Sequence, residues 1–361
     1  TSWMLRKSPD IVHTTLCNRM PKISVLMPSY NHAPFVMEAV RSIQAQTFND
    51  WELLIVDDGS TDGSQQLLQT INDARIKVTL LERNRGACFA MNTALAQSQG
   101  DFIAVLNSDD VARPHRFVAQ LDFLTKNSNV LASFALPDFI DDDGRPSGAA
   151  TNDVFFRAPS GGRAQWLRYF IDNTNCLCHP TLMARRGLYD KVGNYDNTLV
   201  QLPDFDLWVR ALRHGDIAVQ REILIDFRML RGGRNASAPS IPALMRCQPE
   251  LYWIARHFFS FDDGLLQEAL SGTEVSDATL RHSPRLGLIE YLAAQNRPYS
   301  LMAALDAARD ELKKDMTPSL REKFLVWTGS LDPFGLVARS HYVAPTPAPA
   351  TSFASAFGRR Y

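Results

Sequence analysis

The sequence predicts an α/β protein with a mostly parallel sheet flanked by helices, followed by an α-helical C-terminal region. Three observations support this prediction. Short apolar runs alternate with helical patterns through the first half of the chain, as in βαβ units. Strand-like runs cease beyond Pro242. Helical patterns then occupy residues 284–331, broken at Pro298 and Pro318.

Four buried strands are expected, because each of four runs is apolar enough to be covered on both faces. They are residues 23–27, 51–57, 76–81 and 102–106. Apolar residues at helical spacing fill the gaps between these runs. A further amphipathic helix is expected after Pro114, and a further strand over residues 130–136. Residues 138–202 are irregular and predict a loop-rich lobe.

Composition excludes several classes of protein. The chain has 361 residues, of which 45% are hydrophobic and 21% charged, as in ordinary folded domains. A net charge of -1 gives no general basic field, so nucleic acid is not an expected partner. No apolar run approaches the ~20 residues of a membrane span. Five cysteines without framework spacing indicate reduced thiols and a cytoplasmic protein.

Polar strings follow each expected strand. They are Pro28-Ser29-Tyr30-Asn31, Asp57-Asp58-Gly59-Ser60-Thr61-Asp62, Glu82-Arg83-Asn84-Arg85-Gly86 and Asn107-Ser108-Asp109-Asp110. Ligands of open parallel sheets bind beyond the carboxyl ends of the strands, where these strings should meet. Carboxylates gathered there repel one another unless a cation is bound, and oxygen ligands favour Mg²⁺ or Mn²⁺. The sequence therefore predicts a metal and phosphate site at this rim.

Three strings in order make a recognisable pattern. They are Ser24-Val25-Leu26-Met27-Pro28-Ser29-Tyr30-Asn31, Val56-Asp57-Asp58-Gly59-Ser60-Thr61-Asp62-Gly63-Ser64 and Asn107-Ser108-Asp109-Asp110. Together they resemble family 2 glycosyltransferases of the GT-A fold, over about residues 21–237. The resemblance implies a metal-dependent inverting enzyme that moves a sugar from a nucleotide-sugar donor to a hydroxyl acceptor. That acceptor would be a glycan, a lipid-linked molecule or a protein, in bacterial surface polysaccharide or glycoconjugate assembly.

The nucleotide site is expected at the strand ends. Its predicted residues are Pro28, Tyr30, Asn31, Asp58, Asn84, Arg85, Asn107 and Ser108. The Tyr30 ring can stack on a base while Asp58 accepts a base N–H, which favours UDP, dTDP or GDP, with UDP first. The alternatives are a turn-packing aromatic for Tyr30 and an Asx-turn for Asp58. For Asn84 and Arg85 the alternative is a solvated loop.

Asp109 stands where the resemblance implies a ligand for Mn²⁺ or Mg²⁺. The first acid of the family's Asp-x-Asp signature is replaced by Asn107, whose amide can still hydrogen-bond a ribose hydroxyl. Asp110 is expected to cap or orient, and it is also a candidate contact for acceptor or phosphate. The alternative for Asp109 is an Asp-rich turn before Arg113 and Pro114.

Asp204 is the predicted general base. Inverting transfer needs one group to take the proton of the acceptor hydroxyl. The string Leu202-Pro203-Asp204-Phe205-Asp206 resembles the place where the family has Glu-Asp ahead of a helix, with Pro203 in place of Glu. A helix N-cap is the alternative role for Asp204, while Asp206 is expected to pair with Arg210 four residues on.

Three weaker candidates complete the predicted site. His179 resembles an acceptor contact, with a core histidine as the alternative. Zinc binding by Cys176, Cys178 and His179 is not expected, because no second ligand pair has suitable spacing. Arg231 and Arg234 could clamp the pyrophosphate, or belong to a solvated loop.

The same sequence patterns predict the domain boundaries. Residues 1–20 are a lead segment, 21–240 the catalytic domain, 241–340 the helical region and 341–361 a Pro/Ala-rich tail. Within the catalytic domain, 21–137 would bind nucleotide and 138–240 acceptor. The helical region would contact acceptor, partner or the inner membrane surface, and the tail permits a further domain. The changes at Asn107 and Pro203 leave a second hypothesis, an inactive nucleotide-binding or scaffold module of this fold.

Overall fold

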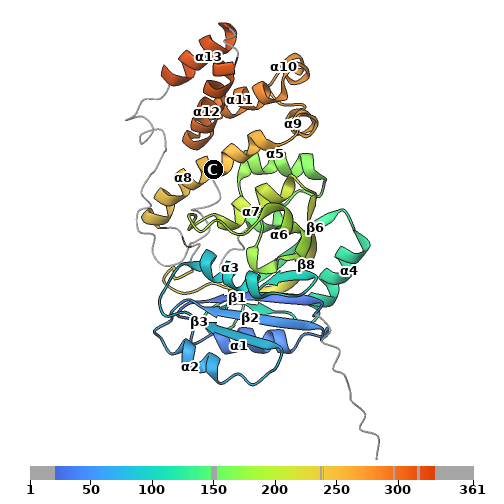
Figure 1. Ribbon diagram of the computed structural model, residues 1–361, viewed down its shortest axis with the longest axis vertical. Helices are drawn as coiled ribbons and strands as arrows, with labels where there is room; N and C mark the ends of the chain where they lie inside the picture. The colour runs from blue at the N-terminus through green and yellow to red at the C-terminus, as the bar shows by residue number, and fades with distance from the viewer. Residues whose placement is uncertain are drawn as a thin grey trace, which may run out of the picture.

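The computed structural model of the chain describes residues 21–147, 153–235, 238, 240–295, 297–314 and 318–329. A sheet with helices on both faces forms one part of the molecule, and the C-terminal helices stack at one end of it (Figure 1). The predicted lead segment 1–20 and the tail 341–361 lie outside the described residues.

Strands and helices are interspersed up to residue 228, and the described elements after it are helical. The strands are β1 Ile23–Ser29, β2 Trp51–Asp57, β3 Ile76–Leu80, β4 Phe102–Val105, β5 Val111–Ala112, β6 Val130–Ile140, β7 Met183–Arg185 and β8 Asp216–Arg228. The helices between them are α1 Val36–Gln44, α2 Ser64–Gln69, α3 Ala87–Gln97, α4 Arg116–Lys126, α5 Arg163–Asn173, α6 Arg186–Val192 and α7 Pro203–Leu212. The C-terminal helices are α8 Ile241–His257, α9 Asp263–Leu270, α10 Asp277–His282, α11 Pro284–Ala294, α12 Pro298–Lys314 and α13 Pro318–Gly329.

The strands form one eight-stranded sheet in the order β3-β2-β1-β4-β7-β6-β8-β5. The four strands predicted first, β1 to β4, pair in parallel, and so do β6 and β8. The three antiparallel pairings all involve β5 or β7, which have only two and three residues. The sheet is therefore mixed. Its parallel part, β1 to β4, contains the strand ends at which the site is expected.

The strand β8 was not predicted. Its centre contains Gln220, Arg221 and Glu222, which interrupt the apolar pattern expected of a buried strand. Pairing with β6 over most of its length compensates for this break, although the register shifts at several points. The irregular lobe over residues 138–202 also contains more regular structure than expected, including α5, α6 and β7.

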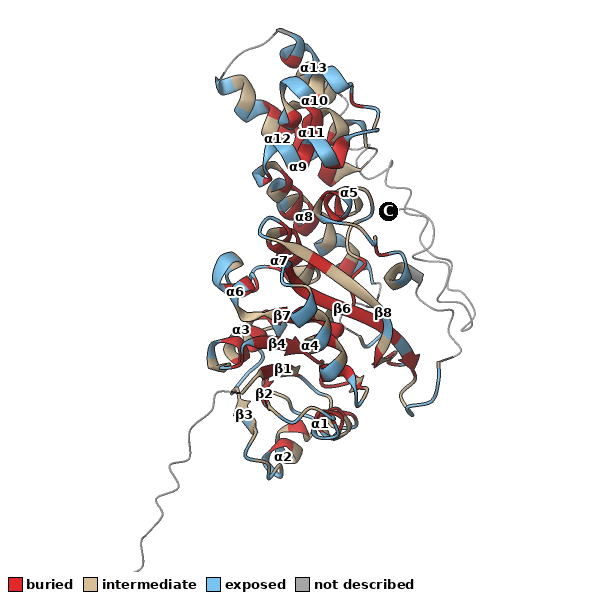
Figure 2. Ribbon diagram, turned by 90° about the vertical axis from the view of Figure 1, so that its right-hand side faces the viewer, coloured by how far each residue is buried: buried red, intermediate tan, exposed pale blue. Residues whose placement is uncertain are grey.

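Two hydrophobic cores lie on opposite faces of the sheet. Alternate residues of β1 point into different cores, with Val25 and Met27 on the side of α1 and Leu26 on the side of α3. The core on the α3 side continues through α7 into α8, α11 and α12. Figure 2 shows buried residues running from the strands into the facing sides of these helices. The C-terminal helices thus share a core with the sheet.

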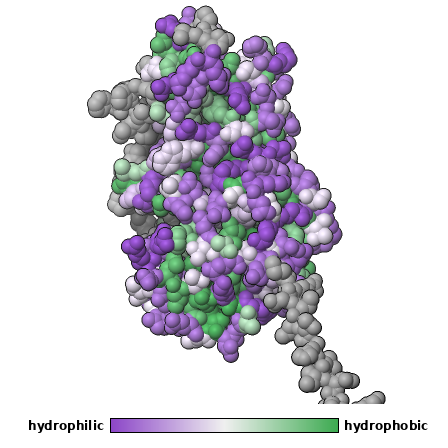
Figure 3. All heavy atoms as spheres, in the orientation of Figure 1, coloured by the Kyte–Doolittle hydropathy of each residue, from purple (hydrophilic) through white to green (hydrophobic). Residues whose placement is uncertain are grey.

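The surface is mostly polar. Hydrophilic residues cover most of the face seen in Figure 3, and hydrophobic residues gather in its lower part, over the end of the sheet that holds β1 to β3. Within the part of the chain that the structure describes, no helix has the length and apolar character needed to cross a bilayer.

Candidate active site

The loops that follow β1 and β2 are bonded to each other at the predicted rim. The amide of Asp58 donates to the Ser29 carbonyl at 2.8 Å, which extends the pairing of the two strands. Asn31 has a positive φ of 53°, a conformation that asparagine tolerates better than most residues. Its side-chain oxygen accepts from the Thr61 amide at 2.9 Å, and its own amide donates to Ser60 Oγ at 2.8 Å. Asn31 therefore joins the two loops.

The two acids at the end of β2 have different partners. Asp57 is buried and accepts from the amide and hydroxyl of Ser60, at 2.8 and 2.6 Å, so Asp57 rather than Asp58 holds the turn after β2. Asp58 accepts from the amides of Arg85 and Gly86 at 2.7 and 2.8 Å. The Asp58 carboxylate thus anchors the loop after β3, and each of its oxygens retains a second lone pair.

The loops after β2 and β3 approach each other so closely that one position between them requires glycine. A Cβ at Gly59 would lie 2.5 Å from the backbone carbon of Arg83, and the φ of Gly59 is +73°. Both facts require glycine at this position. The consequence is that the loops after β2 and β3 touch directly, which places Asn84 and Arg85 beside Asp58.

Four of the side chains predicted to meet the nucleotide are exposed at this rim, those of Tyr30, Asn31, Asn84 and Arg85, whereas Asp58 and Ser108 are buried. Tyr30 is 44% exposed at the end of β1, which leaves its ring available for stacking. The Arg85 guanidinium lies over the Phe89 ring at 3.4 Å. The side-chain oxygen of Asn84 accepts from the Gly86 amide at 3.2 Å, so Asn84 helps to shape the loop.

The turn after β4 separates the roles of Asp109 and Asp110. Both oxygens of Asp110 have protein donors, the amide of Arg228 at 2.9 Å and Nδ2 of Asn107 at 3.1 Å. Asp110 therefore orients the turn, as predicted. Burial raises the pKa of Asp109, and at Asp110 burial and the neighbouring charge of Asp109 raise the pKa well above its usual range.

The position of Asp109 is compatible with a metal that arrives with its substrate. Asp109 Oδ2 lies 3.9 Å from Nε2 of His32, while Nδ1 of His32 bonds the buried Ser108 hydroxyl at 2.8 Å. Among the described residues, no group of three or more His, Cys, Asp or Glu side chains is arranged to hold a metal ion. Mg²⁺ and Mn²⁺ sites often need only one or two carboxylates together with substrate phosphates. Asp109 fits that kind of site.

Arg228, at the end of β8, bonds the turn after β4 and the turn after β6. Its side chain is almost fully buried and stacks over the Phe35 ring at 4.8 Å. It donates to the carbonyl of Asp109 at 2.8 Å, to the carbonyl of Asp141 at 2.8 Å and to the carboxylate of Glu38 at 2.6 Å. Sequence reasoning missed this residue, because the only local signal was a charged residue at the end of an unpredicted strand.

Asp204 lies in the first turn of α7. Leu202 is the N-cap and its side chain makes no capping hydrogen bond, so the alternative role of Asp204 as N-cap is wrong. Oδ2 of Asp204 accepts from Nδ2 of Asn175 at 2.8 Å, a partner that was not predicted. Burial, the main cause, raises the pKa of Asp204 from 3.8 to about 6. The predicted apolar face of α7 is confirmed, and all of its residues are buried: Phe205, Trp208, Val209 and Leu212.

Asp206 is structural. Its predicted ion pair with Arg210 is confirmed at 2.7 Å, and its other oxygen meets Nε2 of His257 in α8 at 3.0 Å. Burial alone would raise the pKa of Asp206, but the contacts with His257 and Arg210 outweigh it and lower that pKa.

His179 is held within the protein. Its Nε2 meets the Tyr195 hydroxyl at 2.9 Å, and its ring packs against Trp208. Burial lowers the pKa of His179 to about 4, so the ring is neutral near pH 7. Cys176 and Cys178, beside it in the sequence, are buried free thiols.

Arg231 and Arg234 meet acids of the turn after β6. Arg231 contacts the carboxylate of Asp143 at 2.7 Å, and Arg234 contacts that of Asp142 at 2.9 Å. Both arginine side chains are more than half exposed, and exposed pairs contribute only about 0–1 kcal/mol. A phosphate could therefore replace these partners at little cost.

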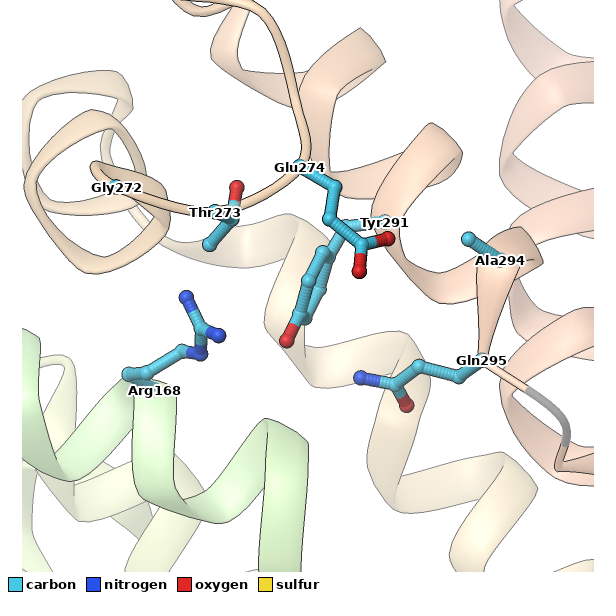
Figure 4. A pocket seen from close by; sticks show the side chains of 7 residues that line it. All are labelled: Arg168, Gly272, Thr273, Glu274, Tyr291, Ala294 and Gln295. Carbon is cyan, nitrogen blue, oxygen red and sulfur yellow. The ribbon is translucent and has the colours of Figure 1, made fainter.

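A cavity of about 470 Å³ lies away from the rim, between α5, the segment after α9, and α11. Figure 4 shows Arg168, Thr273, Glu274 and Tyr291 around it. Arg168 and Tyr291 both bond Asp172, so the polar lining of this cavity is partly engaged within the protein. None of the predicted site residues lines it.

Comparison with known proteins gives the family. A family model described as Glycosyl transferase family 2 matches residues 24–193. The putative teichuronic acid biosynthesis glycosyltransferase TuaG of Bacillus subtilis is 32% identical over 233 residues, covering 62% of this chain and 84% of TuaG. The chain belongs to glycosyl transferase family 2. The predicted family is thereby confirmed.

A further relative and a solved structure extend the comparison of this glycosyltransferase. The UDP-Gal:alpha-D-GlcNAc-diphosphoundecaprenol beta-1,3-galactosyltransferase of Escherichia coli is 28% identical over 254 residues, 68% of this chain and 88% of that protein. The structure of S. aureus TarS 1-349 in complex with UDP-GlcNAc matches with a TM-score of 0.58 and 19% identity, over 80% of this glycosyltransferase and 83% of TarS. This likeness confirms the predicted GT-A fold.

Proposed function

We propose that this glycosyltransferase is a metal-dependent inverting enzyme with a UDP-sugar donor and a hydroxyl acceptor. The observation that carries the proposal is the environment of Asp204. A single half-buried carboxylate with a pKa of about 6 is ionised at pH 7 to 8, yet basic enough to take a proton. Inverting transfer needs one such base, and no second carboxylate is required for a covalent intermediate.

The donor would bind at the rim formed by the loops after β1, β2, β3 and β4. In this proposal Tyr30 stacks on the base, and Asp58 uses its remaining lone pairs for the base N–H. The partly exposed side chain of Asn107 would meet the ribose, whereas the buried Ser108 hydroxyl bonds His32 and would not reach it. The choice of UDP is supported by the E. coli relative, whose name specifies UDP-Gal as donor.

Asp109 would hold the divalent metal, Mn²⁺ or Mg²⁺, with the donor phosphates completing its coordination. When bound, the metal would neutralise charge on the departing nucleoside diphosphate. Arg231 and Arg234 would exchange their contacts with Asp142 and Asp143 for the pyrophosphate. These residues bind and orient the leaving group.

Asp204 would accept the proton of the acceptor hydroxyl while that oxygen attacks the anomeric carbon of the sugar. Nδ2 of Asn175 holds one carboxylate oxygen at 2.8 Å, and the other oxygen would face the acceptor. The acceptor would lie in the lobe over residues 138–240, with His179 as a neutral contact. In this division, residues 21–240 form the catalytic domain and 241–340 the helical region.

The setting we propose is bacterial surface polysaccharide or glycoconjugate assembly. The names of the relatives support it, since one is a putative teichuronic acid biosynthesis glycosyltransferase and the name of another specifies a diphosphoundecaprenol-linked sugar. A lipid-linked acceptor would bring this enzyme to the inner membrane surface.

The test is calorimetric binding of UDP, dTDP and GDP, each with Mn²⁺ and with chelator, to the unmodified protein and to Asp109→Ala. We expect UDP to bind in the presence of metal and this binding to be lost in the variant. Release of UDP from UDP-sugars would then establish turnover. Failure of all three nucleotides to bind would overturn the proposal and favour an inactive scaffold of the same fold.

A further inference from the structure

The helix α8 supplies a buried acid to the loop that precedes the proposed base. Glu250 is 3% exposed, and its two oxygens accept from three consecutive amides. The contacts are Val200 at 2.9 Å, Gln201 at 2.9 Å and Leu202 at 2.8 Å, with a further contact from Gln201 at 3.2 Å. Because both oxygens accept, the group is used as a carboxylate.

These contacts fix the segment that leads into α7. Val200, Gln201 and Leu202 precede Pro203, the first helical residue, and the amides of all three donate to the Glu250 carboxylate. A carboxylate near a helix N-terminus also interacts favourably with the helix dipole. Glu250 therefore holds the chain that enters α7, and Asp204 lies only two residues beyond the last amide that Glu250 bonds.

A second contact from α8 meets α7 on the other side of Asp204. His257, seven residues after Glu250 and so on the same face of α8, bonds the carboxylate of Asp206 at 3.0 Å. The loop before Asp204 and the residue two positions after it are thus both held by α8. The helix lies against α7 in Figure 1, and the two share one hydrophobic core.

We propose that Glu250 is a positioning residue for Asp204: it fixes the backbone that presents the base, and it places a negative charge against that backbone. The inference rests on the proposed function, because it assumes that Asp204 accepts the proton of the acceptor. It gives the helical C-terminal region a role in catalysis that needs no contact with substrate.

The electrostatic part of the proposal follows from the groups around Asp204. The titratable groups that interact with it are Cys88 of α3, Cys178, Tyr195 and Glu250 of α8. Burial raises the pKa of the two thiols and of the tyrosine, so these groups are neutral near pH 7. Burial is the main cause of the raised pKa of Asp204, and the charge of Glu250 raises that pKa further. Removing that charge should lower this pKa.

The test compares the unmodified protein with Glu250→Gln and Glu250→Asp in a UDP-release assay across pH 5 to 9. In Glu250→Gln we expect kcat to fall roughly tenfold or more, because small misplacements of reacting groups are costly. We also expect the acid limb of its kcat/KM profile to move to lower pH by roughly 0.3 to 1 unit. In Glu250→Asp, which keeps the charge on a shorter side chain, kcat should fall while the acid limb stays in place.

A matched control is Glu290→Gln, which removes a glutamate of α11 that pairs with Lys323 and should leave both quantities unchanged. UDP binding within about twofold of the unmodified protein would show that the variants are folded. An unchanged kcat and acid limb in Glu250→Gln would overturn the proposal, as would a lower kcat with an unmoved acid limb, which is the result of a purely structural role. If Glu250→Gln does not fold, full activity of Glu250→Asp would overturn it. Absence of turnover in the unmodified protein would instead refute the proposed function.

Discussion

Asp204→Asn should separate catalysis from stability, because it removes a charge while keeping the shape of the side chain. The amide oxygen can still accept from Asn175, but the amide cannot take a proton from the acceptor. We expect UDP release at pH 8 to fall by about 10²- to 10⁴-fold, the usual contribution of a general base.

The same substitution should stabilise the protein. The pKa of Asp204 rises from 3.8 to about 6 on folding, so ionising this carboxyl costs stability, and the loss develops as pH rises from about 4 to 6. Two pKa units correspond to about 3 kcal/mol as an upper limit, and partial exposure of Asp204 reduces the figure to about 1–2 kcal/mol. Asp204→Asn should therefore be more stable than the unmodified protein at pH 8 and similar to it at pH 4.

Denaturant unfolding at both pH values and UDP release at pH 8 would measure these effects. Asp122→Asn, which removes an exposed acid paired with Lys126, is the matched control and should change stability by less than about 0.5 kcal/mol. The reasoning is refuted if Asp204→Asn keeps more than a tenth of the turnover. It is also refuted if the variant is less stable than the unmodified protein at pH 8.

Three further predictions follow from the site geometry. The kcat/KM of the unmodified protein should fall about tenfold per unit below pH 6, since Asp204 must be ionised, and a flat profile from pH 5 to 8 in a UDP-release assay would contradict this. Tyr30→Ala should weaken UDP binding by roughly 1–3 kcal/mol in calorimetry, as for other base-stacking aromatics, whereas Tyr30→Phe should bind normally. Gly59→Ala should lower the free energy of unfolding by more than about 1 kcal/mol, because its Cβ would lie 2.5 Å from backbone atoms. Gly63 also has a positive φ, but a Cβ there would have open space, so Gly63→Ala should lower the free energy of unfolding by less. Equal decreases in the two variants would argue against the clash.

The sequence predicted the parallel half of the sheet and the polar strings at its rim. These features depend on local patterns, the period of apolar residues in β1 to β4 and the polar residues that end each strand. The pair between Asp206 and Arg210 was predictable for the same reason, because residues four apart face each other on any helix. Near neighbours in the chain determine all of these.

Only the tertiary structure decided which groups hold the reactive side chains. Arg228 reaches the Asp109 carbonyl from a strand 119 residues away in the chain, and Glu250 reaches the amides before Asp204 from a separate helix. Neither contact has a local sequence pattern, since each depends on how elements distant in sequence pack. The continuous core between the sheet and the C-terminal helices brings α8 against α7. Strand periodicity therefore determines where the rim lies, whereas packing between elements distant in the sequence determines which groups surround the base.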